Sequence, residues 1–459
     1  MIILQCIKNI YNILVTMIKW ILFVYWFSRN YNIIRIDTVY ARQFKNRLEN
    51  LGIMGIKFGQ YICSRTDITT DIMKQELQIF LSENKLHSMN HTMMILNKAK
   101  INNIIIEDVI GSGSLTQVYR CRLPAYSMND TFVLKVKHPD VCKIKYEISA
   151  LKYLLKILSC FNRFKLFINV DWNNFFMLLE TQLDLNNEKK FMEKYYSIYN
   201  NNKNEIKDIT IPRYIVGNED FIIMTYCEGK PLNTYPRDSI QYRKAMILFG
   251  SSTMHTFYKH MIIHGDIHEG NILVRDDGSI SIIDFGICIE LNDDECHGIY
   301  ALSNFANDPT YNNIKLVVYA LAQSLDIYNN IIDIDILSQE IYDMVIKIDV
   351  ANKNNNKRST INNTFNIVVN VTNKYNVLIK SNILLYFMNI ALTESLSPFI
   401  GEEKLVEMSL VMLYMKNNKY FVEECEHFLD DYYKDSISYI SKEILEKYID
   451  KNANIINIR

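Results

Sequence analysis

The chain has 459 residues, which is enough to bury a large core and to form about two or three domains. Its formal net charge of −1 predicts no nucleic-acid partner, since such partners are recognised by an excess of basic residues. The 9 cysteines include no Cys-x-x-Cys pair and follow no pairing pattern, which favours a reducing compartment and argues against a disulfide-stapled secreted fold.

Residues 1–28 are strongly apolar and have three interpretations. A transmembrane helix would use residues 10–27, near the lower length limit for a span, and would place Lys19 in the bilayer at a cost of about 2.5–3.5 kcal/mol. On a helical wheel the polar side chains fall within one arc of about 100°, which favours a helix that lies on a membrane surface or docks on the folded domain. These side chains are Gln5, Lys8, Asn9, Asn12, Thr16 and Lys19. A cleaved targeting peptide is the third interpretation.

The first 60 residues carry eight basic and two acidic side chains, a formal charge of +6. This basic flank suits an anionic membrane surface. If residues 10–27 span a membrane, the basic residues between 29 and 47 would hold the body of the protein on the cytoplasmic side.

Downstream, apolar spacing and turn residues predict a helical segment, a small β-rich segment and a long helical segment. Helices are expected over residues 40–51, 56–64, 71–84, 140–161, 172–196 and 237–260. Strands are expected over residues 104–110, 117–123, 131–137 and 220–226, with residues 227–230 as a hinge. From residue 287 onward the chain is predicted to be mostly helical, with apolar faces at 314–325, 383–396 and 405–413.

The most informative stretch is residues 264–286, HGDIHEGNILVRDDGSISIIDFG. Two β-prone runs around an Asp-Asp-Gly turn predict a hairpin, which would bring Asn271 and Asp284 to one point. An amide and a carboxylate oxygen beside a phosphate suit Mg²⁺. Asp266 lies where a catalytic carboxylate positions or deprotonates the nucleophile in phosphoryl transfer from ATP. The alternative, buried aspartates that only cap turns, requires three residues to fall at kinase spacing by chance.

A lysine and a glutamate complete the expected catalytic group. Lys135, on the predicted strand 131–137, matches the Val-Ala-x-Lys pattern, whose ammonium holds the α and β phosphates. Lys137 lies on the same face of the strand and is the alternative phosphate-binding lysine. A purely structural interpretation is that both lysines face solvent on an edge strand. Such a lysine needs a helix glutamate to orient it, for which we expect Glu188, with Glu147 as the alternative.

A loop with small residues precedes this strand. Gly111, Ser112, Gly113 and Ser114 follow one predicted strand and precede another, so that backbone N–H groups there could approach phosphates. The loop lacks the third glycine of a kinase loop and has Thr116 in its place. Many hairpins carry glycine, but the position of this loop between a predicted strand and the Lys135 strand favours a nucleotide-binding loop.

Four segments together resemble the UbiB/ADCK-type atypical kinases. Residues 57–60 (KFGQ), with Ser64-Arg65-Thr66-Asp67 after them, resemble the family's Lys-x-Gly-Gln signature. Residues 114–118 (SLTQV) resemble the end of its Ala-rich loop, and Gln182-Leu183-Asp184 with Glu188 resembles its Glu-x-Asp motif and helix glutamate. Residues 264–271 (HGDIHEGN) resemble its His-Ala-Asp-Pro-His-Pro-Gly-Asn loop.

The resemblance implies an N-terminal extension that folds over the active site and occupies the space of a protein substrate. Lys57 and Gln60, three residues apart on a helix, would point at the nucleotide, and Asp184 would join them. It also implies ATPase activity rather than protein phosphorylation, and a link to ubiquinone-like prenyl-lipid metabolism at a membrane.

Several departures from the family pattern bear on the expected function. Gly111-Ser112-Gly113 replaces the Ala-rich loop, which puts the family's unusual nucleotide handling in doubt. Gln182 replaces the glutamate of Glu-x-Asp, so that an ion pair with Lys57 becomes a neutral hydrogen bond unless Glu180 substitutes. No Ala-Pro-Glu segment follows Asp284, which argues against a peptide-substrate platform.

The predicted fold is α+β and bilobal, of protein-kinase type, with a mainly helical C-terminal lobe. The expected domains are a membrane-associating helix (1–28), a helical extension (29–100), a small nucleotide-binding lobe (101–230) and a helical large lobe (231–459). The expected cofactors are ATP and Mg²⁺, with Asn271 and Asp284 as metal ligands.

The expected activity is that of an ATP-dependent phosphotransferase or ATPase, intracellular and associated with a membrane. A small-molecule kinase of the aminoglycoside or choline kinase type and a nucleotide-sensing pseudokinase that regulates a lipid-synthesis assembly are the alternatives. The expected partners are a nucleotide, a prenyl lipid or phenolic small molecule, a membrane surface, and a second copy of the chain or a lipid-synthesis complex.

Overall fold

The computed structural model describes most of the chain up to residue 292 and one later helix. The described ranges are residues 2–64, 69–81, 86–127, 130–139, 141–158, 172–200, 208–237, 239–266, 269–292 and 334–354, with isolated positions at 160 and between 310 and 374. They fall into two compact units, which are described separately. The first comprises residues 1–189 and 214–226, and the second residues 190–213 and 227–459.

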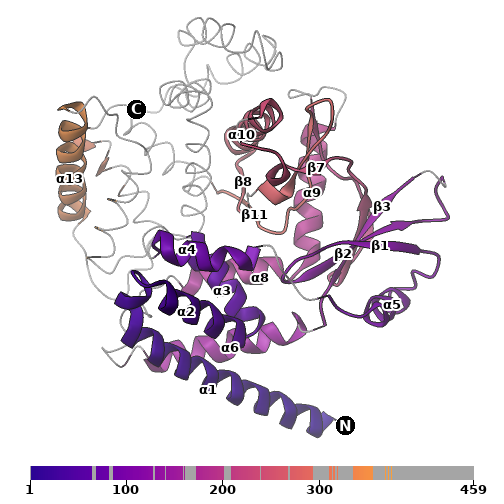
Figure 1. Ribbon diagram of the computed structural model, residues 1–459, viewed down its shortest axis with the longest axis horizontal. Coiled ribbons are helices and arrows are strands. Elements are labelled where there is room, and N and C mark those ends of the chain that lie inside the picture. Colours follow the sequence, from indigo (N-terminus) through magenta and orange to yellow (C-terminus); the bar gives the residue numbers. More distant parts are fainter. Residues whose placement is uncertain are drawn as a thin grey trace, which may run out of the picture. The chain divides into compact units, whose positions relative to one another are not determined.

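The first unit begins with a group of helices (Figure 1). These are α1 (Ile2–Ile34), α2 (Thr38–Asn50), α3 (Ile53–Ser64) and α4 (Asp71–Leu77), followed by the 3-10 helix η1 (Gln78–Leu81). Asp37 starts α2 by accepting hydrogen bonds from the N–H groups of Val39 and Tyr40. The helix predicted over 71–84 is shorter than expected, because its α-helical part ends at Leu77.

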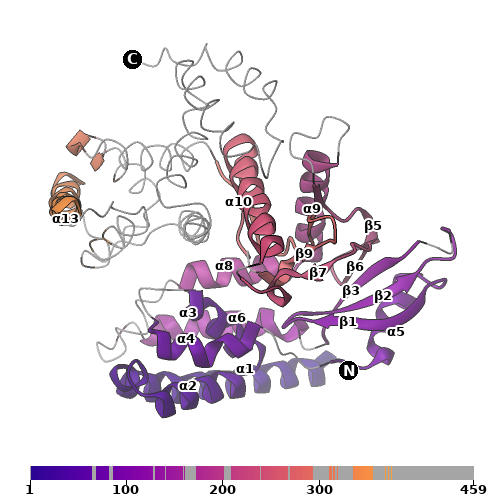
Figure 2. The same cartoon turned by 45° about the horizontal axis from the view of Figure 1, so that its top comes forward.

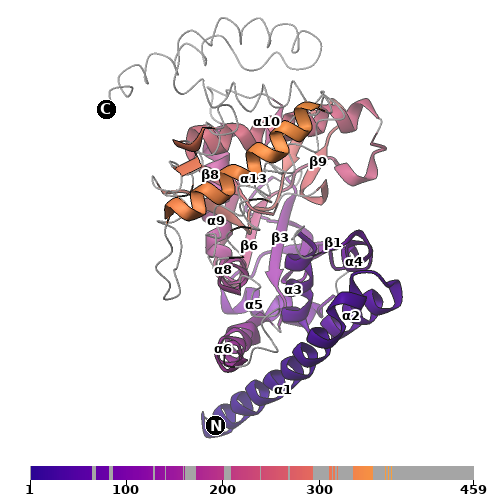
Figure 3. The same ribbon diagram turned by 90° about the vertical axis from the view of Figure 1, so that its left-hand side faces the viewer.

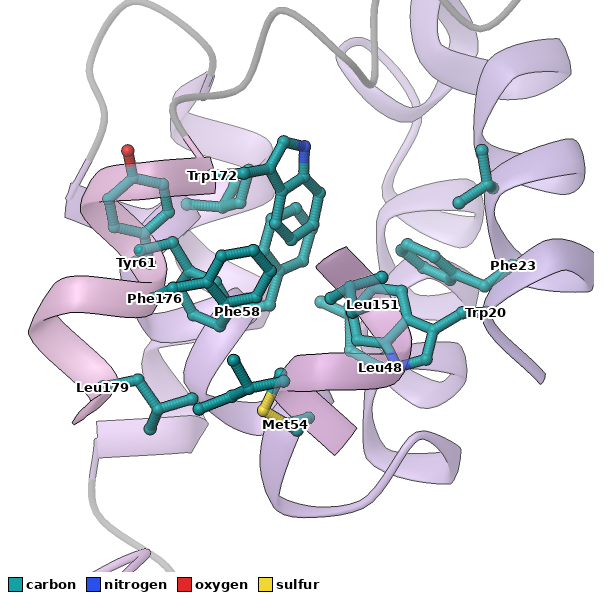
Figure 4. Close-up of a cluster of buried hydrophobic side chains, with 14 of the residues drawn as sticks. Trp20, Phe23, Leu48, Met54, Phe58, Tyr61, Leu151, Trp172, Phe176 and Leu179 are labelled. Carbon is teal, nitrogen blue, oxygen red and sulfur yellow. The ribbon is translucent and has the colours of Figure 1, made fainter. Parts of the chain in front are cut away.

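Helix α1 is docked along one face. It packs against α6 (Val141–Leu158) and α2, as Figure 3 shows for α1 and α6 at the foot of the first unit. Its buried side chains enter an aromatic cluster (Figure 4), in which Trp20 meets Phe58 and Trp172 edge-on, and Phe58 stacks on Trp172 with ring centroids 4.7 Å apart. No helix in the described part of the chain has an apolar stretch long enough to cross a membrane. The packing of α1 on α6 and α2 agrees with docking on the folded domain, one of the two placements that the polar arc favoured.

A five-stranded antiparallel sheet forms the rest of the first unit. Its order is β1-β2-β3-β6-β5, and every neighbouring pair is antiparallel. The strands are β1 (Ile105–Ser112), β2 (Thr116–Arg122), β3 (Phe132–Lys137), β5 (Tyr214–Gly217) and β6 (Phe221–Thr225), so the four predicted strands are confirmed. Helix α5 (Met89–Lys98) lies beside the sheet (Figure 2), and its Leu96 belongs to the same buried apolar cluster as Leu134 and Phe221.

The helix predicted over 172–196 is wrong in one respect, because it is two helices. They are α8 (Trp172–Gln182) and α9 (Leu185–Tyr199). Between them the Asp184 carboxylate accepts the N–H of Asn186 at 2.9 Å, as an N-cap does, so a new helix begins there.

The second unit is built on α10 (Ile240–His260), which ends at Met261 in the left-handed conformation. The helix packs against β8 (Ile262–His264), β9 (Ile272–Val274) and β10 (Ile280–Ile282). The other elements are β4 (Ile209–Thr210), β7 (Lys230–Pro231), the 3-10 helices η3 (Leu232–Thr234) and η4 (Glu269–Asn271), β11 (Cys288–Glu290) and α13 (Ile334–Asn354). The predicted apolar faces at 383–396 and 405–413 lie outside the described residues, as does most of 314–325.

Candidate nucleotide and metal site

Lys135 and Glu188 form a buried ion pair in the first unit. Lys135 is on β3, in the middle of the sheet, and its Nζ lies 2.7 Å from Oε1 of Glu188 in the first turn of α9. The two residues are 7% and 3% exposed. The structure thus pairs the lysine with Glu188, while Glu147 lies half-buried on α6.

The position of Glu188 is a consequence of the break at Asp184. Since α9 starts at Leu185, Glu188 belongs to its first turn, where a carboxylate is favoured by the helix dipole. The alternative, Lys137, is half-buried on the same strand. Burial lowers the pKa of Lys137, and the nearby carboxylates of Asp220, Glu219 and Asp184 oppose that shift.

The small-residue loop is a tight connection between β1 and β2. Gly111 and Ser112 are the last residues of β1, and the N–H of Gly113 donates to the carbonyl of Thr116 at 2.8 Å. Gly113 and Ser114 therefore turn the chain before β2. The imidazole of His138, just after β3, lies 3.0 Å from the carbonyl oxygen of Gly113 and 3.4 Å from the hydroxyl of Ser112.

Half of the Lys57-Phe58-Gly59-Gln60 motif serves packing. The Gln60 side chain donates its amide N–H to the carbonyl of Phe80 at 2.7 Å, and a Cβ on Gly59 would lie 2.6 Å from the Phe80 ring. Both residues thus hold η1 against α3. Lys57 is half-buried on the same helix. Of the rest of the signature, Arg65, Thr66 and Asp67 lie outside the described residues.

The residues of the Glu-x-Asp segment are spread over separate contacts. Gln182 is half-buried at the end of α8, and Asp184 is exposed and caps α9. Glu180, considered as a substitute for the family glutamate, pairs with Lys152 at 3.0 Å and is exposed.

The second unit brings Asp266, Asn271 and Asp284 together through strand pairing. Strands β8 and β11 pair antiparallel with His264 opposite Cys288, while β9 and β10 form the predicted hairpin. The loop before β9 and the loop after β10 therefore lie at the same end. There the side-chain N–H of Asn271 donates to the backbone carbonyl of Asp266 at 2.9 Å, and the backbone carbonyl of Asn271 accepts the N–H of Ile283 at 3.1 Å.

His264 links the two aspartates. Its Nε2 lies 2.6 Å from the Asp284 carbonyl, which can only accept, so Nε2 carries the proton. The neutral ring then has Nδ1 as an acceptor, which faces the N–H of Asp266 at 3.4 Å. His264 is buried and so fixes the two loops against each other.

The donors at this end fit Mg²⁺. The side-chain N–H of Asn271 donates to the backbone carbonyl of Asp266, so the side-chain oxygen of Asn271 is the atom that can bind a metal ion. Asp284 supplies a carboxylate, whose Oδ1 accepts the N–H of Gly286 at 2.9 Å. One amide oxygen and one carboxylate suit a hard cation that also keeps phosphate and water ligands. Within the described residues no group of three or more His, Cys, Asp or Glu side chains is arranged for a metal, so a fully protein-made metal cage is not found there.

A second anchor holds the loop between Asp266 and Asn271. Glu269 accepts the phenolic proton of Tyr242 at 2.6 Å and lies 3.4 Å from the guanidinium of Arg237. Glu269 occupies the position at which the His-Ala-Asp-Pro-His-Pro-Gly-Asn loop of the UbiB/ADCK-type kinases has its second proline. This difference is the sequence feature that could have indicated the contact with Tyr242. Burial, followed by the hydrogen bond to Glu269, raises the pKa of Tyr242 to about 12, so the phenol stays a donor at neutral pH.

The fold and these residues define a kinase-like α+β protein. Residues 73–315 match the model of the ABC1 atypical kinase-like domain, which is more than half of the chain. The chain belongs to this family, whose members include the ABC1/aarF domain-containing kinases.

Three curated relatives show the extent of the similarity. "Protein ACTIVITY OF BC1 COMPLEX KINASE 1, chloroplastic" of Arabidopsis thaliana is 26% identical over 59% of this chain and 41% of its own. "ABC1 family protein YPL109C, mitochondrial" of Saccharomyces cerevisiae is 24% identical over 52% and 40%. "ABC1 family protein C21C3.03, mitochondrial" of Schizosaccharomyces pombe is 22% identical over 52% and 40%. The match thus spans about two fifths of the length of these relatives.

Among solved structures, a complex of Rv3197 with erythromycin from Mycobacterium tuberculosis is similar over 69% of this chain and 84% of that chain. The TM-score is 0.41 and the sequence identity 14%.

Proposed function

We propose that the protein binds Mg-ATP and catalyses phosphoryl transfer or ATP hydrolysis. The observation that carries this proposal is the buried pair of Lys135 and Glu188. Burying two charges in a small sheet costs several kcal/mol per ion by general estimates, and apolar residues of similar size would often stabilise the fold as well. Such a pair is therefore better explained by the need to hold an ammonium ready for a phosphate.

The residues divide the expected chemistry among them. Lys135, aimed by Glu188, would bind phosphate oxygens, and the loop from Gly111 to Ser114 would approach them through its backbone. Asn271 and Asp284 would hold Mg²⁺, which when bound neutralises the charge that develops on the phosphates. Asp266 would orient the attacking hydroxyl or water and accept its proton.

For the acceptor, we propose water or a small lipid-like alcohol or phenol, in the prenyl-lipid class. The absence of an Ala-Pro-Glu segment after Asp284 supports a non-peptide acceptor. The names of the relatives, which carry the words chloroplastic and mitochondrial, favour an organelle as the location.

The outer face of α1 supports contact with a membrane surface. Large apolar side chains there are exposed, with basic residues beside them: Leu14, Ile18, Ile21, Leu22 and Tyr25 are apolar, and Lys19 and Arg29 are basic. The Arg29 guanidinium lies over the Tyr25 ring, 5.1 Å from its centroid. Such a mixed face suits the boundary between headgroups and acyl chains.

The activity is tested by ATP turnover and by calorimetry of nucleotide binding. Asp266→Asn should abolish phosphate release with little change in Mg-ATP affinity, whereas Asp284→Asn should weaken affinity only when Mg²⁺ is present. Asp276→Asn, in the hairpin turn, is the matched control and should behave as the wild type. Equal phosphate release by wild type and Asp266→Asn would reject catalysis, and Mg-ATP binding without turnover in either would favour the pseudokinase alternative.

The acceptor and the membrane need separate tests. Turnover should rise with liposomes and prenyl phenols, and a rise with aminoglycosides or choline instead would favour the small-molecule kinase. Deleting residues 1–28 would also remove Trp20 and Phe23 from the core, so the better variant is Ile18→Gln with Leu22→Gln on the outer face. It should lose flotation with anionic liposomes, while Ile240→Gln, exposed on α10, should float as the wild type does.

A further inference from the structure

A run of hydrogen bonds in the first unit ends on the small-residue loop. It involves Gln117 and Tyr119 on β2, Thr92 on α5, and the rings of His87 and His138. Gln117, Tyr119 and Thr92 are buried, and the two rings are half-buried. The Nδ1 atoms of the two histidines lie 2.7 Å apart.

The direction of this run is fixed at its two ends by backbone groups. At one end the N–H of His87 can only donate, so the Gln117 atom 2.7 Å away is its oxygen, and the amide nitrogen faces Tyr119. At the other end the carbonyl of Gly113 can only accept, so Nε2 of His138 carries a proton.

The tautomers of the two rings then follow, and the shortest contacts give the arrangement of the hydroxyl protons. In a neutral His138 ring Nδ1 is the acceptor, so His87 donates from its own Nδ1 and accepts at Nε2. Thr92 donates to that Nε2 at 2.8 Å, and Tyr119 donates to Thr92 at 2.7 Å. The Tyr119 hydroxyl also lies 3.3 Å from Nε2 of His87, and whichever hydroxyl donates to that nitrogen, the nitrogen accepts. The Gln117 amide donates to the Tyr119 oxygen at 2.7 Å and begins the series. Five groups from four segments of the chain thus agree on the tautomers of the two rings.

We propose that His138 is a positioning residue for the nucleotide loop, and that Gln117, Tyr119, Thr92 and His87 act by fixing its tautomer. The proposal rests on the proposed function, since it gives the loop from Gly111 to Ser114 a nucleotide to bind. The Nε2–H of His138 holds the Gly113 carbonyl and also lies near the Ser112 hydroxyl. It thereby stiffens the turn that must present N–H groups to phosphates.

The arrangement depends on both rings staying neutral. A proton added to either ring would force the bonds to reverse, and the hydroxyl proton of the buried Thr92 would lose the acceptor that it now has on His87. The titratable groups that face His87 are His138, Tyr119 and His91, whose ring meets that of His87 edge-on. None of these three is a carboxylate that would stabilise a charged imidazole.

The test combines nucleotide affinity with the tautomers seen by NMR. His138→Ala should weaken Mg-ATP binding about five- to tenfold, and His138→Gln, which keeps an N–H at a similar reach, should recover part of the loss. Thr92→Val, which keeps the shape and removes the hydroxyl, should weaken binding less. His91→Ala is the matched control, because its Nε2 contacts the Lys137 carbonyl instead of the loop.

Nitrogen-15 spectra of the imidazoles separate the two proposals. The wild type should show His138 protonated at Nε2 and His87 at Nδ1, and Thr92→Val should mix these tautomers. Wild-type affinity in a folded His138→Ala protein, or the opposite tautomers in the wild type, would overturn the positioning role. If the wild type shows these tautomers but does not bind Mg-ATP, the proposed function fails and the role in nucleotide binding fails with it, whereas the hydrogen-bonded series itself stands.

Discussion

Tyr242 donates its phenolic proton to Glu269 at 2.6 Å, and this contact ties helix α10 to the loop between Asp266 and Asn271. The phenol is nearly buried, whereas Arg237, which also approaches Glu269, is exposed. A hydrogen bond to a charged group is stronger than an exposed ion pair, so Tyr242 contributes more to the position of the loop than Arg237 does. A proline at position 269 would limit the backbone conformation of the loop, because its ring fixes φ. In this chain the hydrogen bond from Tyr242 to Glu269 holds the loop instead.

Tyr242→Phe should therefore lower ATP turnover about three- to tenfold and leave the KM for ATP nearly unchanged. The variant keeps the ring in the core and removes only the hydrogen bond, which is worth about 1–2 kcal/mol. Steady-state kinetics on liposomes measure both parameters. Arg237→Gln should cost less than twofold, and a larger loss from Arg237→Gln than from Tyr242→Phe would contradict the assignment.

The pair of Lys135 and Glu188 allows binding to be separated from stability. Lys135→Met should abolish measurable Mg-ATP binding and destabilise the protein by about 3–5 kcal/mol, because Glu188 remains buried without its partner. Lys135→Met combined with Glu188→Leu should regain most of that stability and still fail to bind nucleotide. Chemical denaturation and calorimetry give the two readouts. Nucleotide binding by the apolar double variant would show that the pair is only structural.

The strands and the catalytic segment could be predicted from the sequence because their signals are local. Alternating apolar and lysine residues marked β3, a short apolar run marked β6, and the Asp-Asp-Gly turn marked the hairpin that aligns Asn271 with Asp284. The break between α8 and α9 at Asp184 was not predicted, because the helical spacing of apolar residues continues through Leu183. Aspartate is, however, a preferred N-cap residue, so Asp184 could have indicated the start of a new helix.

The contacts that could not be predicted join distant segments. His87, Thr92, Tyr119 and His138 belong to four segments, and no spacing rule relates them. The same holds for α1, where the polar arc predicted a docked face but could not name Trp172 as the partner of Phe58. Gly59 also fits the resemblance, yet its close approach to Phe80 becomes visible only once η1 is placed.

Gly59→Ala should destabilise the protein, although replacing glycine by alanine in a helix interior normally stabilises the helix by about 1 kcal/mol. The reason is that the added Cβ would meet the Phe80 ring at 2.6 Å, and overpacking of this kind costs about 1–3 kcal/mol. The double variant Gly59→Ala with Phe80→Leu should recover part of the lost stability, because the smaller leucine leaves space for the added Cβ. Thermal unfolding of the single and double variants measures this, and a stabilised Gly59→Ala protein would contradict the close packing of α3 on η1.

The stability of the first unit should fall below neutral pH in a way that His87 controls. Burial, with the neighbouring His138 and His91, lowers the pKa of His87 from 6.5 to about 4. The unfolded chain, with the ordinary pKa, therefore binds more protons between these values, so the free energy of unfolding is highest above pH 6.5 and falls as the pH falls toward 4. Because solvent screens this half-exposed ring, we expect its share to be about 1 kcal/mol.

Urea denaturation of the wild type and His87→Asn at pH 7.5 and pH 5, taken as about neutral and mildly acidic conditions, measures this share. His87→Asn removes the titrating group, so the wild type should exceed the variant in stability by about 1 kcal/mol more at the higher pH than at the lower. His91→Asn serves as the comparison: it should reduce the pH dependence only in part, because burial, the largest cause of the lowered pKa of His87, remains. A difference between wild type and His87→Asn that is the same at both pH values would mean that His87 is not held neutral by the fold.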